Sequence, residues 1–90
     1  FGTRATFVQF SSAFCTPCRA TRALLIDITA DLDDVKYIDI DAEKNLGLVR
    51  KVDIRSTPTT LILDGKGKEI ARAVGAPKRA DIIATLNAIN

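Results

Sequence analysis

Two cysteines separated by only two residues constrain this chain more than any other feature. They lie in Cys15-Thr16-Pro17-Cys18, and the sequence has no other cysteine. An apolar run over 6–10 precedes them and a helical pattern follows, so we expect the pair at a strand-to-helix turn. The proline suits the first turn of a helix, where a backbone N–H has no intrahelical partner anyway. A cysteine pair in such a turn is suited to forming and breaking a disulfide.

Length and composition indicate one small globular domain over residues 1–90. The hydrophobic fraction of 47% is typical of a folded protein and argues against disorder. The net charge is +2, and the aromatic residues are four Phe and one Tyr. Because the basic residues are spread along the chain, the basic face with aromatic platforms that nucleic-acid binding uses is not indicated.

The sequence says less about the cellular compartment of the protein than about its fold. No apolar stretch approaches the roughly 20 residues that span a bilayer, and no signal-peptide pattern is present. The chain begins at Phe1 rather than Met, so the sequence leaves open whether an anchor or export signal lies upstream. Two cysteines are too few to define a compartment. We expect a cytoplasmic protein, with an extracytoplasmic domain of a larger or membrane-anchored protein as the alternative.

The chain divides into alternating strand and helix patterns. Strands are predicted over 5–10, 35–40, 59–63 and 68–74, and helices over 16–30, from 41 to about 50, and over 78–89. Glycines at 65 and 67 predict a hairpin turn over 64–67. The order β-α-β-α-β-β-α predicts an α/β fold in which a mixed central four-stranded sheet is flanked by helices. Helical crossovers predict that the first three strands are parallel, and the hairpin adds an antiparallel edge strand.

Apolar residues at helical spacing predict the buried faces of the first and last helices. For the first helix they are Ala20, Ala23, Leu24 and Ile28, and for the last they are Ile82, Ile83, Leu86 and Ile89.

The chemistry of the pair requires a thiolate, because the thiolate is the form that attacks a disulfide. Cys15 is expected at a helix N-terminus, where unpaired N–H groups and the helix dipole favour negative charge. Arg19 and Arg22 add positive charge within two turns. Cys18 lies one turn further in and is expected to be more buried. We therefore expect Cys15 to be the attacking nucleophile and Cys18 to resolve the mixed disulfide.

Two other interpretations of the pair are weaker. A permanent disulfide or two inert thiols would need no strand before the pair and no proline inside it. Structural zinc usually takes four ligands, and this chain has no histidine and no second cysteine pair. No metal site is therefore predicted.

The sequence resembles the thioredoxin family over nearly its whole length. The matching segments are Phe7-Val8-Gln9-Phe10, Cys15-Thr16-Pro17-Cys18-Arg19, Tyr37-Ile38-Asp39-Ile40-Asp41, Ser56-Thr57-Pro58-Thr59 and Val74-Gly75. A C-x-P-C motif combined with a later Thr-Pro-Thr is much more specific than C-x-x-C alone. Residues 1–4 are too few for the strand and helix that precede the cysteine strand in full thioredoxins, so the resemblance implies a minimal thioredoxin fold.

The resemblance implies a thiol–disulfide oxidoreductase that reduces or exchanges protein disulfides through a Cys15/Cys18 cycle. It implies no metal or organic cofactor. The expected partners are protein or peptide disulfides and an upstream reductase or electron donor, and a monomer is expected. A redox-inactive binding module with the same fold is the alternative.

The resemblance also implies a docking surface around the cysteines. Pro58 matches a proline that is cis in the family and packs beside the cysteine pair, which leaves the backbone of Thr57 free to pair with an extended substrate. The other residues expected to contact substrate are Phe14, Thr16, Pro17 and Gly75.

The chain departs from the family pattern at several positions. Gln9 stands where the family carries a buried aspartate, and glutamine cannot take up a proton at neutral pH. Tyr37 stands where the family has a lysine, so we expect a neutral pair in place of a buried ion pair. Phe14 replaces a tryptophan. Thr16 replaces the glycine of thioredoxin itself, which leaves the redox potential and the direction of electron flow open.

Overall fold

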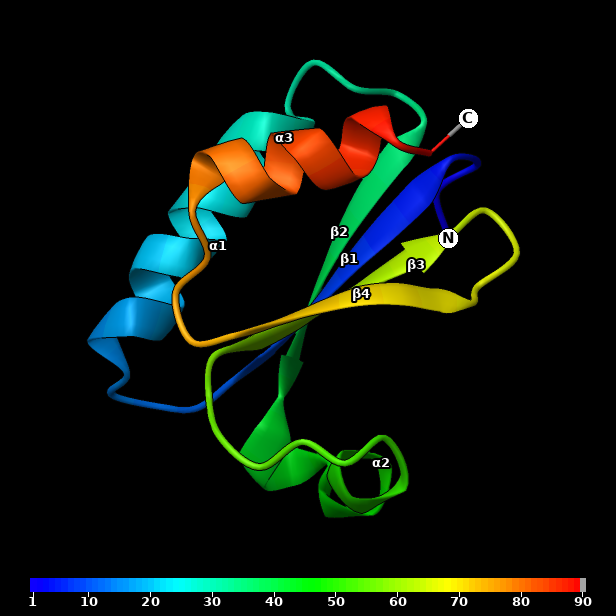
Figure 1. Cartoon of the computed structure of the whole chain (residues 1–90). Helices are drawn as coiled ribbons and strands as arrows, with labels where there is room; N and C mark the ends of the chain where they lie inside the picture. The colour runs from blue at the N-terminus through cyan, green and yellow to red at the C-terminus, as the bar shows by residue number, and fades with distance from the viewer. Residues whose placement is uncertain (90) are drawn as a thin grey trace.

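The computed structural model describes residues 1–89 as a four-stranded sheet with helices on one face and at one end (Figure 1). The strands are β1 Ala5–Ser11, β2 Val35–Asp41, β3 Thr59–Asp64 and β4 Glu69–Val74. The helices are α1 Thr16–Thr29, the 3₁₀ turn η1 Ala42–Lys44, α2 Leu46–Lys51 and α3 Arg79–Asn87. The predicted order of elements is confirmed. The helix predicted from residue 41 is divided at Asn45 into η1 and α2.

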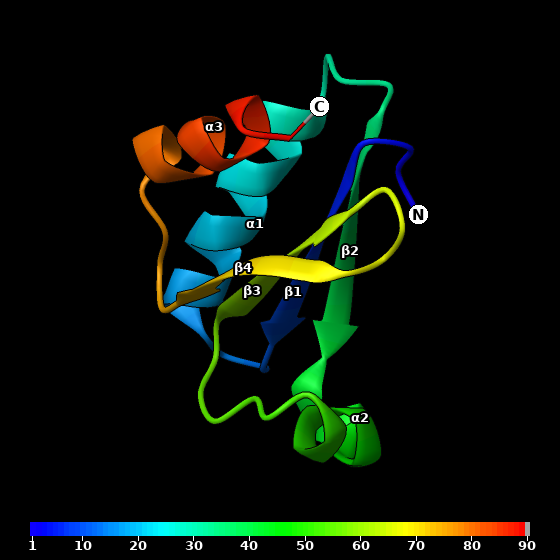
Figure 2. The ribbon, with the colours of Figure 1, turned by 45° about the vertical axis from the view of Figure 1, so that its right-hand side comes forward.

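The sheet has the strand order β2-β1-β3-β4. β1 is parallel to β2 and antiparallel to β3, and β3 is antiparallel to β4. The prediction that the first three strands are parallel is therefore wrong for β3. The reason is the length of α2: its six residues rise about 9 Å, whereas a six-residue strand spans about 20 Å. α2 lies at the end of the sheet where β2 finishes, so β3 must run back the other way (Figure 2).

Helices α1 and α3 cover one face of the sheet (Figures 1 and 2). The core beneath them comprises Ala5, Phe7, Leu25, Ile28, Val35, Ile62, Ile82 and Leu86. In α1 the buried positions are Cys18, Thr21, Leu25 and Ile28. The predicted stripe is right for Ile28 and wrong for Ala20 and Ala23, which are exposed, while Leu24 is partly buried. The observed stripe buries the larger Leu25 and Ile28 in place of the two alanines, and on the same face Gln9 bonds to the carbonyl oxygen of Cys18.

In α3 the buried residues are Ile82 and Leu86. Ile89 packs against the core, but Ile83 is 38% exposed, so its predicted burial is wrong. Ile82 and Leu86 are four residues apart and share a face, whereas Ile83 is turned about 100° away from Ile82 around the helix.

The opposite face of the sheet carries a second, smaller core of Val8, Phe10, Ile54 and Leu61. α2 packs at one end of this face through Val49 and Val52. Beyond α2 the face opens into a cavity of about 330 Å³ lined almost entirely by apolar side chains, including Phe1, Ile38 and Leu63. The two faces thus differ: one lies under two helices, and the other is covered only at its end.

Candidate functional site

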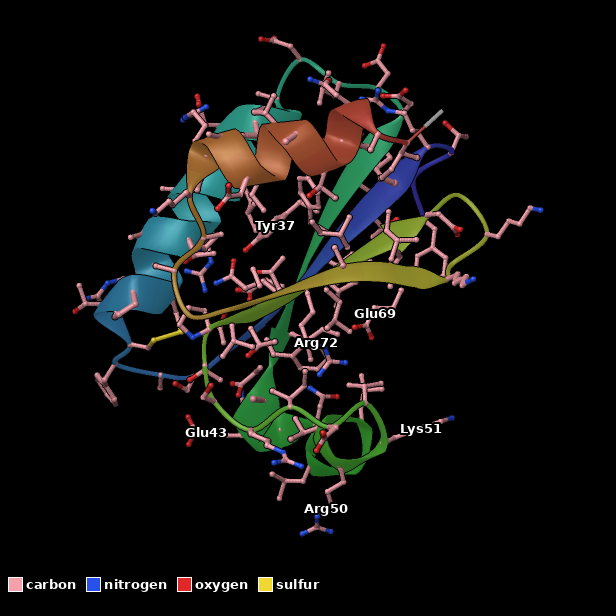
Figure 3. The ribbon with its side chains drawn as sticks, viewed as in Figure 1. Tyr37, Glu43, Arg50, Lys51, Glu69 and Arg72 are labelled. Carbon is pink, nitrogen blue, oxygen red and sulfur yellow. A yellow bond between two sulfur atoms is a disulfide. The ribbon has the colours of Figure 1, made fainter. Side chains whose placement is uncertain are left out.

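A disulfide lies at the N-terminal end of α1 (Figure 3). Cys15 and Cys18 are bonded through their Sγ atoms, and their Cα atoms are 5.2 Å apart, within the usual range for a disulfide. Cys15 is the N-cap residue of α1, and its Sγ accepts a hydrogen bond from the backbone N–H of Cys18 at 3.1 Å. The Cys15 sulfur therefore lies where the unpaired N–H groups of a helix favour negative charge.

The two cysteines differ in exposure as the sequence predicted. Cys18 is only 1% exposed, whereas Cys15 is partly exposed. Cys15 is therefore the cysteine of the pair that is more open to solvent.

The two arginines near the pair behave differently. Arg19 remains at the exposed start of α1, where its Nη2 donates to the Thr16 hydroxyl at 3.3 Å. Arg22 is paired with Asp39, to whose Oδ2 it donates from Nε at 3.0 Å and from Nη2 at 2.6 Å. The hydrogen bonds and the charge of Asp39 hold the pKa of Arg22 above its usual value. The positive charge predicted from Arg22 is therefore largely balanced by Asp39.

Gln9 forms the floor of the site and is completely buried. Its Nε2 donates to the carbonyl oxygen of Cys18 at 2.9 Å and to the hydroxyl of Ser11 at 3.0 Å. Its Oε1 accepts from the hydroxyl of Tyr37 at 2.7 Å. The structure thus confirms the expected neutral pair of Gln9 and Tyr37, and the same glutamine ties the first turn of α1 to β1.

The hydrogen bonds continue from Gln9 toward the surface. The Ser11 hydroxyl donates to Oδ1 of Asp39 at 2.6 Å, and Asp39 is the partner of Arg22. Tyr37 lies in the layer between the sheet and helices α1 and α3 (Figure 3). Burial raises the pKa of Tyr37 to about 12, the negative charge of Asp39 adds to this, and Arg22 opposes it. At neutral pH the phenol is therefore an uncharged donor.

Two further loops approach the disulfide. The hydroxyls of Ser12 and Thr57 are hydrogen-bonded at 2.8 Å, which joins the loop before Cys15 to the loop that follows α2. The Thr57–Pro58 peptide bond is cis, as expected. The backbone N–H of Gly75 donates to the carbonyl oxygen of Pro58 at 2.8 Å, and Gly75 has a φ of +82°, which glycine adopts without a Cβ clash. The structure thus brings together the segments of 12–15, 57–58 and 75.

The outer surface of the site is formed by Phe14, Thr16 and Pro17, all of which are exposed. Phe14 is 100% exposed, and its φ of +57° lies in the left-handed region that residues with a Cβ rarely adopt. The backbone thus turns the largest side chain beside Cys15 completely into solvent.

Within residues 1–89, no group of three or more His, Cys, Asp or Glu side chains is placed to hold a metal ion. In the same residues, none of the helices has both the length and the apolar character that crossing a bilayer requires.

A comparison with protein families matches residues 2–88 to the thioredoxin family. A thioredoxin of Mycolicibacterium smegmatis is 31% identical over 87 residues, which cover 93% of this chain and 77% of that protein. The chain belongs to the thioredoxin family.

Other members of the thioredoxin family agree with this assignment. Thioredoxin H5 of rice is 29% identical over 72 residues, which cover 80% of this chain. The chain spans about half the length of the rice thioredoxins that it matches. The crystal structure of the thioredoxin NaTrxh of Nicotiana alata is 26% identical, with a TM-score of 0.81 over 94% of this chain and 72% of that chain. The thioredoxin of Fasciola hepatica, 22% identical, has the same fold with a TM-score of 0.83 over 99% of this chain and 84% of that chain.

Four side chains of this thioredoxin-family site had no role in the sequence-based prediction. Ser11, Ser12 and Asp39 are described above, and Oε1 of Glu43 accepts from the backbone N–H of Ala13 at 3.1 Å, which holds the loop before the cysteines. Asp39 could have been found from the parallel register, because it is the partner of Gln9 in β2. The Ser12–Thr57 contact joins residues 45 positions apart, and no local pattern indicates it.

Proposed function

We propose that this chain is a thiol–disulfide oxidoreductase that reduces protein disulfides through Cys15 and Cys18. The supporting observation is the disulfide at the start of α1, in which Cys15 is partly exposed and Cys18 is buried. The partly exposed cysteine is the N-cap residue of α1, which is the position that favours a thiolate.

The reaction begins with the reduced pair. The Cys15 thiolate attacks one sulfur of the substrate disulfide, a new S–S bond forms, and the other substrate sulfur leaves as a thiolate that takes up a proton. Cys18 then loses its proton and attacks the Cys15 sulfur. The bond between Cys15 and the substrate breaks, and its electron pair leaves on the substrate sulfur, which also becomes a thiol. Two electrons have passed to the substrate, and an external dithiol or reductase must restore the reduced pair.

The substrate would lie across the surface that surrounds Cys15. Phe14 offers a fully exposed apolar side chain, and the loops of Thr57, Pro58 and Gly75 are joined to the loop before Cys15 through the Ser12–Thr57 and Gly75–Pro58 hydrogen bonds. Thr16 and Pro17 complete this surface on α1. A protein or peptide segment in an extended conformation suits a surface made of exposed side chains such as Phe14, Thr16 and Pro17 better than a small molecule does.

Reduction of insulin disulfides with dithiothreitol as the electron donor tests the proposal. We expect the parent chain to accelerate the reaction, Cys15→Ser to remove the activity, and Cys18→Ser to accumulate a mixed disulfide with the substrate. Lys66→Ala, in the exposed hairpin turn, is the control and should leave the rate unchanged. Unchanged activity in Cys15→Ser would disprove the mechanism.

The alternative is a binding module that keeps the fold without turnover, and the neutral Gln9 at the floor of the site favours it. The rate of Cys15 alkylation against pH separates the two. An activated nucleophile reacts with a midpoint well below that of a free cysteine, whereas a midpoint near 8.5 would favour the binding module.

A further inference from the structure

The loop between β1 and α1 is held by hydrogen bonds to two different parts of the fold. The hydroxyl of Ser12 is bonded to that of Thr57 at 2.8 Å, and the backbone N–H of Ala13 donates to Oε1 of Glu43 at 3.1 Å. Ser12 and Thr57 are both partly buried, whereas Ala13 and Glu43 are exposed. Water competes for an exposed hydrogen bond, so the Ser12–Thr57 bond contributes more to holding this loop.

Thr57 presents an unpaired stretch of backbone at the surface. It directly precedes the cis peptide bond to Pro58 and is only partly buried. Among residues 1–89, its backbone N–H and carbonyl oxygen form no hydrogen bond, while the carbonyl oxygen of Pro58 is taken by the N–H of Gly75 at 2.8 Å. A free donor and acceptor on one residue can pair with an extended chain, as they do at the edge of a sheet.

One hydrogen bond joins the loop before Cys15 to the loop that carries Thr57. Within residues 1–89 it is the Ser12–Thr57 bond, since the hydroxyl of Thr59 donates to the carbonyl oxygen of Ser56 inside the second loop. Ser12 lies three residues before Cys15, which is the N-cap residue of α1. The spacing between Cys15 and the free backbone of Thr57 therefore depends on Ser12.

A peptide can use this spacing in a way that a small thiol cannot. Once its sulfur is bonded to Cys15, its neighbouring backbone pairs with Thr57 only where that residue is within reach. Holding Thr57 in place beforehand removes the cost of ordering the loop during binding. A small thiol contacts Cys15 alone, so the position of Thr57 does not affect its binding.

We propose that Ser12 is a positioning residue whose hydroxyl holds the free backbone of Thr57 at a fixed distance from Cys15, and that it thereby makes the site prefer peptide sulfurs to small ones. The inference rests on the proposed function and names the residue that gives it selectivity for peptides. Ser12 acts through Thr57.

Thiol exchange on Cys15 tests this without turnover. In a Cys18→Ser background, Cys15 is first converted to its mixed disulfide with mercaptoethanol, and a short peptide with one cysteine is then added. The bond from Cys15 to mercaptoethanol breaks, the bond from Cys15 to the peptide forms, and the proton of the peptide thiol passes to the released mercaptoethanol, so nothing is oxidised overall. Mass spectrometry of the two mixed disulfides at equilibrium gives the exchange constant.

We expect Ser12→Ala to lower the exchange constant for the peptide by about fivefold, the effect of losing one neutral hydrogen bond. Ser12→Thr keeps the hydroxyl and should retain the parent value. Thr57→Val removes the other half of the bond and should cause a similar fall. The double variant Ser12→Ala, Thr57→Val should fall no further, because both changes remove the same bond.

Two controls separate positioning from a general effect on the fold. Thr29→Val removes a hydroxyl that donates to the carbonyl oxygen of Leu25, at the far end of α1 from the cysteines, and should leave the exchange constant unchanged. The rate at which iodoacetamide alkylates reduced Cys15 should be the same with and without Ser12→Ala, since this small reagent does not use Thr57.

An exchange constant that neither Ser12→Ala nor Thr57→Val lowers would overturn the inference, and so would losses that add in the double variant. A matching fall in the alkylation rate would also overturn it, because Ser12 would then act on Cys15 itself. Since the exchange uses a chain without Cys18, failure of the parent to reduce insulin would refute the proposed function alone. A parent that reduces insulin but shows no Ser12 effect would refute only this inference.

Discussion

Gln9 shows how a single residue changes the interior of this site. A buried carboxylate would be costly without a partner, whereas a glutamine amide can satisfy all its neighbours while it stays neutral. Here it bonds to Ser11, Cys18 and Tyr37 at once. The floor under the disulfide is therefore held by uncharged hydrogen bonds, and the nearest ion pair, Arg22 with Asp39, lies toward the surface.

Tyr37 allows this arrangement to be measured. The chain has one tyrosine and no tryptophan, so the absorbance change near 295 nm on raising the pH reports Tyr37 alone. Because burial raises its pKa to about 12, we expect a midpoint near that value in the folded chain and near 10 after unfolding in urea. A folded chain that titrates near 10 would show that the phenol is solvated and that its bond to Gln9 is not maintained.

Phe14 combines a strained backbone with a fully exposed side chain. Asparagine tolerates the left-handed conformation better, so Phe14→Asn should stabilise the chain by about 1 kcal/mol in urea unfolding. The same change removes the apolar contact expected for substrate, and insulin reduction should slow. Phe14→Leu is the matched control: it keeps both the strain and an apolar group, and should gain no stability. Loss of stability in Phe14→Asn would contradict the argument.

At the scale of elements, Arg72 connects β4 to the end of α2 (Figure 3). Its guanidinium donates to the carbonyl oxygens of Val52 at 2.9 Å and Asp53 at 3.0 Å. It also forms a two-point contact with Glu69, at 2.8 and 2.9 Å. Because α2 is short and contributes no buried residue, these bonds are a major tie between the loop that leads to Pro58 and the sheet.

Removing this tie should loosen the loop. We expect Arg72→Met to lower the free energy of unfolding by about 1–2 kcal/mol and to accelerate hydrogen exchange at the amide of Ile54, which bonds to the carbonyl of Val49 at 2.8 Å. Arg55→Met is the control, since the Arg55–Asp53 pair is highly exposed and should contribute little. Equal effects of the two variants would show that Arg72 has no special role.

At the scale of the whole molecule, ionisable groups define the pH range of stability. Hydrogen bonds from the backbone of Lys68 and Lys66 lower the pKa of Asp64, and Arg72 lowers that of Glu69. Carboxylates with lowered pKa in the folded state stabilise it above their unfolded pKa values, and this contribution is lost as pH falls through the folded values. Tyr37 affects stability at the alkaline end of the pH range. Because its pKa is raised in the folded state, the free energy of unfolding falls as pH rises from about 10 to about 12.

Urea unfolding of the oxidised chain from pH 2 to pH 12 should therefore show a plateau with losses below about pH 4 and above about pH 10. The double variant Asp64→Asn, Glu69→Gln should flatten the acid limb and leave the alkaline limb unchanged. Tyr37→Phe should do the reverse. If the double variant loses stability in acid as much as the parent chain does, other carboxylates are responsible for that loss and the prediction is wrong.

Much of the fold and the centre of the site could be predicted, because both depend on patterns of neighbouring residues that can be recognised in the sequence. Strand and helix patterns located the elements, and the C-x-P-C motif with Pro58 located the site. The orientation of β3 could not be predicted by the crossover rule, because the path of the chain after β2 depends on where the short α2 packs. The buried stripe of α1 was misplaced for a similar reason: the rotation of the helix depends on how its side chains, Leu25 and Ile28 among them, pack against the sheet.

The sequence by itself determined the family, the cysteine pair at the start of a helix, the cis Pro58 and the pairing of Gln9 with Tyr37. The first two follow from residue types in motifs of stated spacing, and the last two are what the resemblance to the thioredoxin family implies. Only the tertiary structure decided the direction of β3, the bond between Ser12 and Thr57, and the pairing of Arg22 with Asp39. These depend on contacts between residues far apart in the chain, whose geometry is set by packing and not by any local pattern.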